Sequence, residues 1–215
     1  MRKSLFTLFI VLFLYNLSFS QIKEGRIIYD ISYPETKGDT ALMMMLPRES
    51  TVYFNADNLR MDMLMGQGLS NRLFIDNKSG DMHFLAETPG SKTDFVITSK
   101  DKKSKVKEEN TVEYTDVTKD IAGLKCKKAI VKTASGQIYN VWLTNEILVN
   151  NAAWNEDLSG VKGFMMEFAM SQGSINMIMS ARSVYSEKVA ESLFIVPEGY
   201  QKITSEDLKK FSGDK

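Results

Sequence analysis

Apolar and polar residues alternate with a period of two along most of this 215-residue chain, and this rhythm constrains the fold more than any other feature. Successive side chains of a strand point to opposite faces, so such alternation indicates strands that are buried on one side. In residues 26–33 the apolar face consists of Ile27, Tyr29, Ile31 and Tyr33. The pattern predicts about eleven strands, at residues 26–33, 51–54, 59–65, 73–76, 82–85, 95–98, 112–117, 125–132, 137–144, 164–170 and 175–185.

Helical signals are few. Residues 39–46 and 150–158 are candidate short helices, each followed by a helix-breaking residue. Residues 204–211 form the best candidate, because Thr204 is a suitable N-cap and the charges that follow complement the helix dipole. Residues 100–109 are rich in lysine, and mutual repulsion of these charges predicts a solvated loop.

A sheet with this many strands curls, because closing or covering the curl removes exposed edges. The predicted fold is therefore mainly β: a single curved antiparallel sheet forming an unclosed half-barrel. One to three short helices would act as a lid over its hollow side, and a further helix would end the chain. A two-sheet sandwich is the alternative. The sequence contains no internal repeat, so residues 21–215 are predicted to form a single domain.

The N-terminus has the layout of a secretory signal peptide. Arg2 and Lys3 precede an apolar run over residues 5–17, and small residues stand at the two positions that a signal peptidase reads. Residues 1–20 are therefore predicted to be removed before Gln21. The alternative is an uncleaved membrane anchor, but the run is shorter than the ~20 residues that span a bilayer. The predicted location is the periplasm or the outer membrane of a Gram-negative envelope, with the protein as a monomer.

Charge and cysteine content exclude several classes of protein. Removing Arg2 and Lys3 leaves two fewer basic than acidic residues, a net charge of −2, and no basic stripe with interleaved aromatics points to nucleic acid. Cys126 is the only cysteine, so the chain has no internal disulfide and its core must stabilise the fold. Cys126 is predicted to be a small buried hydrophobe, with a reactive thiol as the alternative.

Several segments of the chain resemble proteins that sort bacterial lipoproteins, the LolA-like carriers and LolB-like receptors, and an exported domain family of unknown function. The resemblance implies an unclosed antiparallel barrel with helices as a lid over a hydrophobic cavity, which holds acyl chains in the carriers. The carriers hold their lid with an arginine, and Arg60 stands at a plausible place for it without being assigned that role. The segments that carry the resemblance are residues 50–61, 73–83, 123–129, 139–142 and 194–200.

Methionine recurs at alternate positions in three predicted strands, so that its side chains share a face. Three interpretations are open. The first is ordinary core packing. The second is a pliable apolar pocket, because flexible thioethers adapt to ligands of different shape while specifying a rigid core poorly. The third is a Cu(I) site, since thioethers select that ion, although residues two apart in a strand lie ~6.6 Å from each other and need help from another strand.

These observations favour an exported, non-enzymatic protein that binds a hydrophobic small molecule or a lipoprotein acyl chain. The alternatives are an envelope protein-interaction module without a ligand, and a methionine-rich Cu(I) binder. No catalytic residue, metal ligand or cofactor is predicted, since His83, the only histidine, lies in mid-strand and no phosphate loop or nucleophile elbow is present. The predicted ligand-binding residues are Phe54, Met61, Met63, Met65, Trp142, Met166, Phe168, Met177 and Met179.

Overall fold

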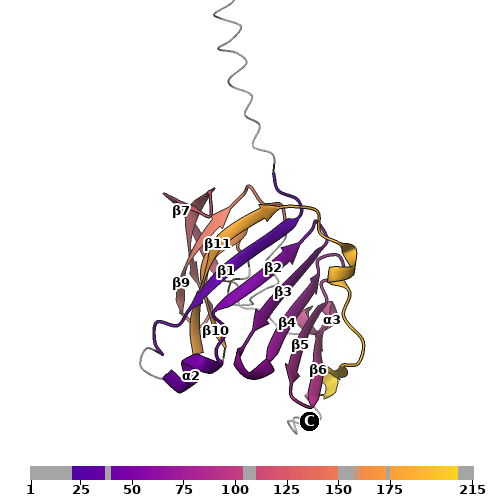
Figure 1. Cartoon of the computed structure of the whole chain (residues 1–215). Coiled ribbons are helices and arrows are strands. Elements are labelled where there is room, and N and C mark those ends of the chain that lie inside the picture. Colours follow the sequence, from indigo (N-terminus) through magenta and orange to yellow (C-terminus); the bar gives the residue numbers. More distant parts are fainter. Residues whose placement is uncertain are drawn as a thin grey trace, which may run out of the picture.

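The computed structural model describes residues 21–36, 40–103, 110–149, 158, 160–172 and 175–207. Over these ranges the chain forms one 12-stranded sheet (Figure 1). The strands are Gly25–Ser32 (β1), Glu49–Phe54 (β2), Asn58–Leu64 (β3), Ser70–Asp76 (β4), Met82–Thr88 (β5), Ser91–Ile97 (β6), Thr111–Ile121 (β7), Leu124–Lys132 (β8), Ile138–Thr144 (β9), Phe164–Gln172 (β10), Ile175–Ser186 (β11) and Gln201–Thr204 (β12).

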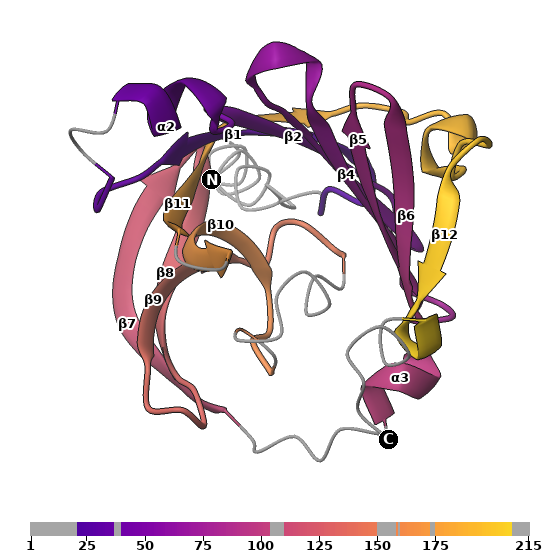
Figure 2. The ribbon, with the colours of Figure 1, turned by 90° about the horizontal axis from the view of Figure 1, so that it is seen from below.

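The sheet is a curled half-barrel, as predicted. Its spatial order is β12-β6-β5-β4-β3-β2-β1-β11-β10-β9-β8-β7, so nearly every strand pairs with its neighbour in sequence. Pairing of β1 with β11 joins the two sequence halves into one surface. Seen from below, the strands run around a common interior, with the end strands β7 and β12 on opposite sides of the ring (Figure 2).

All eleven predicted strands are confirmed, and β12 is an addition that the sequence pattern did not predict. This strand pairs with β6 in parallel, so the prediction of a purely antiparallel sheet is wrong at this edge. The strand is only four residues long and largely exposed, and therefore has no apolar face for an alternation to reveal. It covers the backbone edge of β6, which would otherwise be open to pairing with another chain.

The helices are short and lie at the ends of strands. The helix predicted at residues 39–46 is confirmed as α2 (Thr40–Met45), which lies at the rim of the half-barrel in Figure 2. It packs against a 3₁₀ turn, η1 (Gly66–Gly68), between β3 and β4. A Cβ atom on Gly66 would lie 2.5 Å from the carbonyl oxygen of Met44, so this close approach requires glycine.

Other helical predictions are only partly covered by the described residues. The loop predicted at residues 100–109 begins instead within a helix, α3 (Ser99–Lys103), because the Thr98 and Asp101 side chains form a local cap. Thr204 caps a last turn, because its hydroxyl oxygen accepts from the backbone N–H of Asp207 at 3.3 Å, and the same hydroxyl donates to the Asp207 carboxylate at 2.7 Å. The rest of that predicted helix, the helix predicted at 150–158 except for Leu158, and the predicted signal peptide lie outside the described residues.

One apolar core serves both halves of the sheet. Alternate residues of β1 are buried, as the sequence rhythm predicts, and Tyr29 among them is fully buried. Its hydroxyl donates a hydrogen bond to the carbonyl oxygen of Met165 at 2.7 Å. Its ring meets that of Phe168 edge to face, with centroids 6.1 Å apart. These contacts link β1 to β10, so the core depends on strands from opposite ends of the sequence.

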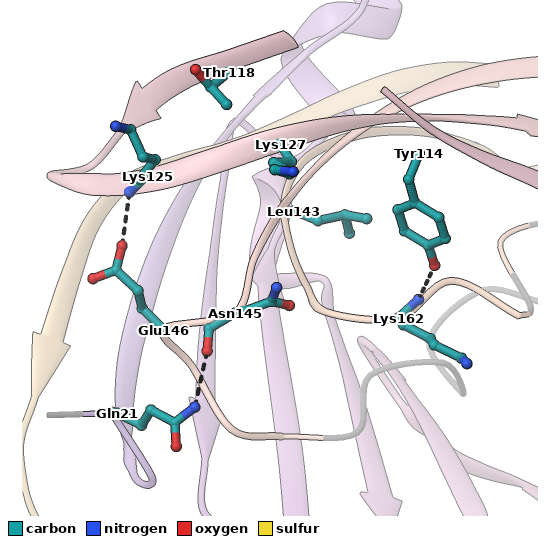
Figure 3. A pocket seen from close by; sticks show the side chains of 9 residues that line it. All are labelled: Gln21, Tyr114, Thr118, Lys125, Lys127, Leu143, Asn145, Glu146 and Lys162. Carbon is teal, nitrogen blue, oxygen red and sulfur yellow. Dashed lines mark hydrogen bonds between the residues drawn. The ribbon is translucent and has the colours of Figure 1, made fainter. Parts of the chain in front are cut away.

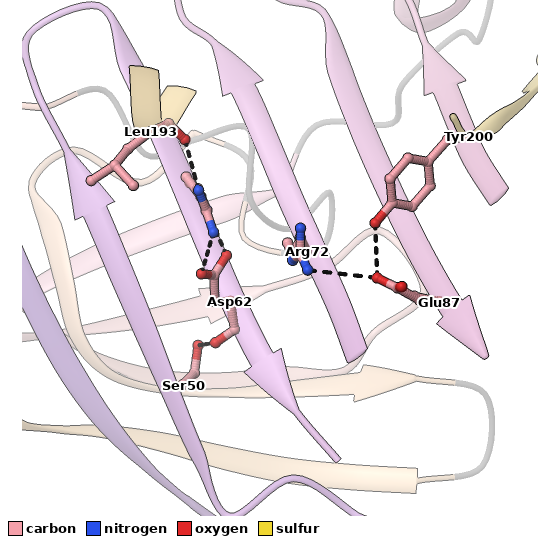
Figure 4. Close-up of polar contacts among 7 residues, drawn as sticks. Ser50, Asp62, Arg72, Glu87, Leu193 and Tyr200 are labelled. Atoms are coloured by element: carbon pink, nitrogen blue, oxygen red, sulfur yellow. Dashed lines mark hydrogen bonds and ion pairs between the residues drawn. The ribbon is translucent and has the colours of Figure 1, made fainter. Parts of the chain in front are cut away.

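The C-terminal segment crosses the outer face of the sheet. A 3₁₀ turn, η3 (Glu191–Phe194), packs on β3. Arg60 binds both carboxylate oxygens of Asp62 at 2.7 Å and donates to the carbonyl oxygen of Leu193 at 3.0 Å (Figure 4). Further along, the hydroxyl of Tyr200 donates to Glu87 at 3.0 Å. Arg60 therefore fastens the C-terminal segment to the convex side, away from the core.

Candidate functional site

The structure gathers most of the predicted ligand-binding side chains in one buried cluster. The methionines on β3, β10 and β11 all contribute to it, as does the aromatic end of β2. Their shared face is the one that the alternation predicts. Seven of the nine residues belong to the cluster, with exposed fractions of 0–7%: Phe54, Met61, Met63, Met166, Phe168, Met177 and Met179.

The other two predicted residues lie at the margins of this cluster. Met65 is half-buried, and its sulfur lies 3.9 Å from the amide nitrogen of Asn71. Trp142 alternates with two buried neighbours on β9 and is itself only partly buried, at the edge of the core cluster. The ammonium of Lys119 stands 4.3 Å from the centre of the Trp142 ring and pairs with Glu167 at 2.7 Å. Trp142 is therefore engaged in a surface cation–π contact.

The methionine cluster is closed in this structure. Met166 and Met179 are fully buried, and Met61 is 2% exposed, which is the burial expected of ordinary core packing. A pliable pocket would require these thioethers to move when a ligand enters, which their flexible side chains permit. Ligand binding by this cluster stays a prediction.

A Cu(I) site at the β3 methionines gains no support from the strand register. Thioether coordination by this strand requires a sulfur from a neighbouring one. Over the described ranges, the side chains also include no group of three or more histidine, cysteine, aspartate or glutamate residues placed to hold a metal ion. Directly opposite Met61 stand Val52 and Leu73, and directly opposite Met63 stand Ser50 and Asn71.

An open cavity lies beside the core, between strands β7, β8 and β9 and residues 160–163 (Figure 3). Its volume is about 520 Å³. This size falls within the range of about 300–1,000 Å³ typical of small-molecule sites. The residues that line it are Gln21, Tyr114, Thr118, Lys125, Lys127, Leu143, Asn145, Glu146 and Lys162.

The floor of the cavity is continuous with the apolar core. Lys127 stands opposite Leu143 on one side and Thr118 on the other in the strand register. Leu143 is only 4% exposed and is a member of the core cluster. Lys127 lies on the same face of β8 as the buried residues Ala129 and Val131. The cavity therefore opens directly onto a core residue, Leu143.

Hydrogen bonds fix the polar wall of the cavity. The backbone N–H of Lys162 donates to the hydroxyl of Tyr114 at 2.8 Å. The backbone N–H of Lys125 donates to a carboxylate oxygen of Glu146 at 2.9 Å. The side-chain amide of Gln21 donates to the carbonyl oxygen of Asn145 at 3.4 Å. The wall thus draws on segments that are distant in sequence, which Figure 3 shows converging.

This cavity was not predicted from the sequence. In residues 125–132 the period-two pattern is broken by three lysines around a cysteine, and such lysines are expected to face water. Lys127 does reach water although it pairs with the core residue Leu143, because the buried positions of β8 change from Ala129 and Val131 to Cys126 along the strand. The sequence signal for the site is weak: Lys127 stands at an even spacing from the apolar residues Ala129 and Val131.

Comparison with known proteins places the chain in a family. The sequence profile of the family described as a domain of unknown function, DUF4412, matches residues 40–158, more than half of the chain. The chain belongs to the DUF4412 family. The prediction of a domain family of unknown function is thereby confirmed. No curated protein matches the sequence of this DUF4412 chain.

Solved structures of PNGF-II share the fold of the DUF4412 chain. One, in space group P21, aligns with a TM-score of 0.55 and 14% identity over 89% of this chain and 34% of the PNGF-II chain. Another, in space group C2, gives a TM-score of 0.54 and 17% identity over 88% of this chain and 32% of the other. The chain spans about a third of the length of PNGF-II, and at these identities the likeness concerns the fold alone.

These comparisons decide neither the resemblance to lipoprotein carriers nor the predicted export of the chain. The resemblance to lipoprotein carriers stays a prediction, because the similar structures reported above are of PNGF-II. Within the described part of the chain, no helix combines the length and the apolar character needed to cross a bilayer.

Proposed function

We propose that this DUF4412 chain is an exported, non-enzymatic binding protein that holds the apolar body of a small molecule or lipid on the concave side of its half-barrel. The ligand would enter through the cavity between β7, β8, β9 and residues 160–163. One observation carries the proposal: Leu143 both lines that cavity and belongs to the buried core. An apolar group that enters the cavity therefore meets the core directly.

Removal of apolar ligand surface from water supplies the driving force, at about 25 cal/mol per Å². The cavity is large enough for part of an acyl chain or a small ring system, at about 520 Å³. A longer ligand would need more room, and the neighbouring core is rich in thioethers that repack easily. The methionine stripes would then line the deeper part of the site in the bound state.

The proposal of a non-enzymatic role rests on how the only histidine is used. His83 Nδ1 lies 3.0 and 3.1 Å from the two carboxylate oxygens of Asp94, which is fully buried. Both residues lie on the outer face of β5 and β6, because they alternate with residues that face the interior. His83 is therefore a structural partner of a buried carboxylate, remote from the cavity.

Binding is tested with N-phenyl-1-naphthylamine, a neutral probe that fluoresces in apolar surroundings. Delipidated protein is expected to enhance its fluorescence saturably. Thr118→Trp places a large side chain in the cavity from an exposed position, and we expect it to abolish most of the enhancement. Val117→Trp is the matched control, since Val117 is the adjacent residue, is 54% exposed and does not line the cavity.

Two results would contradict the proposal. The first is absence of saturable binding by folded protein, which would favour the alternative of a protein-interaction module. The second is equal binding by both tryptophan variants and the unchanged protein, which would place the ligand elsewhere.

Export is tested separately. N-terminal sequencing of the protein recovered from a periplasmic or outer-membrane fraction is expected to begin at Gln21. Recovery of the chain with Met1 intact would contradict the predicted signal peptide without affecting the binding test.

A further inference from the structure

We infer that the ligand carries an anionic head group, a carboxylate or a phosphate, at one end of its apolar body, and that Lys127 selects it with the help of Lys125 and Lys162. The inference rests on the proposed function and adds the chemical class of the ligand. Its basis is the juxtaposition of three lysines with a floor that belongs to the core.

The charge that lines the cavity is positive. Its lining includes Lys125, Lys127 and Lys162 against a single carboxylate, Glu146. That carboxylate already accepts a hydrogen bond from the backbone N–H of Lys125 at 2.9 Å. An entering anion therefore meets a net positive surface whose only acidic group is engaged in holding the wall.

The lysines are poorly neutralised by the protein itself. Among the residues that the structure describes, Lys127 approaches one carboxylate, that of Asp116 at 3.6 Å, and the Asp116 side chain is fully exposed. Such an exposed pair is weak and easily exchanged for a ligand contact. Over the described ranges, neither Lys125 nor Lys162 forms an ion pair. Their charges are thus available to a ligand.

The geometry separates a polar end of the site from an apolar end. Lys127 stands directly opposite Leu143 across β8 and β9, so a head group at the ammonium lies next to the entrance to the core. The Tyr114 hydroxyl accepts from the Lys162 amide and keeps its own hydrogen for a ligand oxygen. In Figure 3, Lys127 lies near Leu143, and the Lys162 side chain extends outward from the opposite wall. A flexible lysine there can turn toward a bound anion.

The apolar character of the lysine stems also matters. Lysine buries its methylene groups along apolar surface while its ammonium stays in water. The stem of Lys127, which stands opposite Leu143, gives the cavity an apolar surface that ends in positive charge. This arrangement matches an amphiphile with a terminal anion better than a purely apolar molecule.

The test compares ligands that differ only in the head group. Delipidated protein is titrated with palmitate, with hexadecanol as its neutral counterpart, and with lysophosphatidate against monopalmitoylglycerol. A charge-assisted contact stabilises a complex enough to change affinity about tenfold, so each anion is expected to bind about tenfold more tightly than its neutral counterpart. A larger preference for palmitate over hexadecanol would indicate a carboxylate head group, and a larger preference for lysophosphatidate over monopalmitoylglycerol would indicate a phosphate. Either preference supports the inference.

Charge reversal supplies the matched variants. Lys127→Glu is expected to weaken palmitate binding at least about tenfold while leaving hexadecanol binding within about twofold. Lys132→Glu is the control, because Lys132 is an exposed lysine at the far end of the same strand. Raising the salt concentration should weaken anion binding only, since it screens exposed charges.

The outcomes separate this inference from the proposed function. Equal affinity for the anionic and neutral ligands, unchanged in Lys127→Glu, would overturn the inference and leave the binding function intact. Failure of all four ligands and of the neutral probe to bind would instead overturn the proposed function.

Discussion

Arg60 donates a hydrogen bond from Nη1 to the carbonyl oxygen of Leu193 at 3.0 Å, and thereby ties β3 to a turn 133 residues later in the sequence. Its Nε and Nη2 groups donate to Asp62, and its guanidinium lies within 6 Å of the rings of Tyr53 and Phe74. Only the planar guanidinium of arginine, with its several N–H donors, can make these hydrogen bonds and ring contacts at the same time. Arg60 thus attaches η3 to the outer face, in addition to the pairing of β12 with β6.

Replacing Arg60 by lysine should loosen that attachment. Lysine keeps the charge but cannot bind Asp62 with two donors and reach Leu193 as well. We expect a loss of about 1–2 kcal/mol in the free energy of unfolding, measured by urea denaturation. Hydrogen exchange should accelerate over residues 187–204 more than over β1. Arg182→Lys is the control, because its ion pairs with Asp30 and Glu49 are exposed and should matter little. Equal exchange in both variants would contradict this role of Arg60.

The pair of His83 and Asp94 should be important for stability. Asp94 is fully buried and His83 is its hydrogen-bonding partner. His83→Ala leaves that carboxylate buried without its partner, and we expect this to lower the free energy of unfolding by about 2–4 kcal/mol. Adding Asp94→Leu to His83→Ala should recover part of the loss, because the buried charge is then removed. Additive losses in the double variant would show that the two side chains do not act as a pair.

The thiol of Cys126 should be inert in the folded protein. The residue is fully buried, and desolvation raises the pKa of the thiol to about 11. Because the thiolate is the reacting form, Ellman's reagent at pH 8 should label the native chain only at the rate of unfolding. Denatured protein should react at once with one equivalent. Rapid labelling of native protein would restore the alternative of a reactive cysteine.

Alkaline conditions should destabilise the protein through its buried tyrosines. Burial raises the pKa of Tyr33 to about 12 and that of Tyr29 well above its ordinary value. Their hydroxyls donate to the carbonyl oxygens of Pro47 and Met165. Above pH 10 the unfolded chain ionises while the folded one does not, so stability is full below pH 10 and falls as the pH rises toward 12.

Absorbance at 295 nm measures tyrosine ionisation directly. Native protein at pH 11 should retain at least two un-ionised tyrosines that denaturation releases. The substitution Tyr33→Phe should reduce this number by one and flatten the fall in stability. Full ionisation of all tyrosines in native protein at pH 11 would contradict the burial of these hydroxyls.

Most strands were predictable because apolar and polar residues alternate along them. The short strand β12 was not, because it lacks such a pattern. Alternation located β1 through β11, and strands such as β1 and β3 show alternate residues buried in the core. The short strand β12 is held by backbone pairing with β6, which leaves no trace in the pattern of side chains. The capping role of Thr204 was predicted from local chemistry alone and is confirmed by the hydrogen bond that its hydroxyl oxygen accepts from the backbone N–H of Asp207.

The candidate site was harder to predict for a similar reason. The methionine stripes identified which faces pack together, and their burial follows from that rule. The open cavity instead depends on where the buried positions of β8 change phase, between Cys126 and Ala129, and on which distant segments form its wall. Lys127 is two residues from buried Ala129 along β8, and only the tertiary contacts decide that Lys127 borders a cavity.

The position of Gln21 has a practical consequence for work with this protein. Gln21 lines the cavity, and the next residue is anchored there by hydrogen bonds of Ile22 with Glu146 and Leu148. Consecutive Cα atoms are ~3.8 Å apart, so a group joined directly ahead of Gln21 is attached beside the cavity. A purification tag at that point would obstruct titrations, and measured affinities would describe the fusion. A small solvent-sensitive dye coupled there would instead turn the same proximity into an optical readout of occupancy.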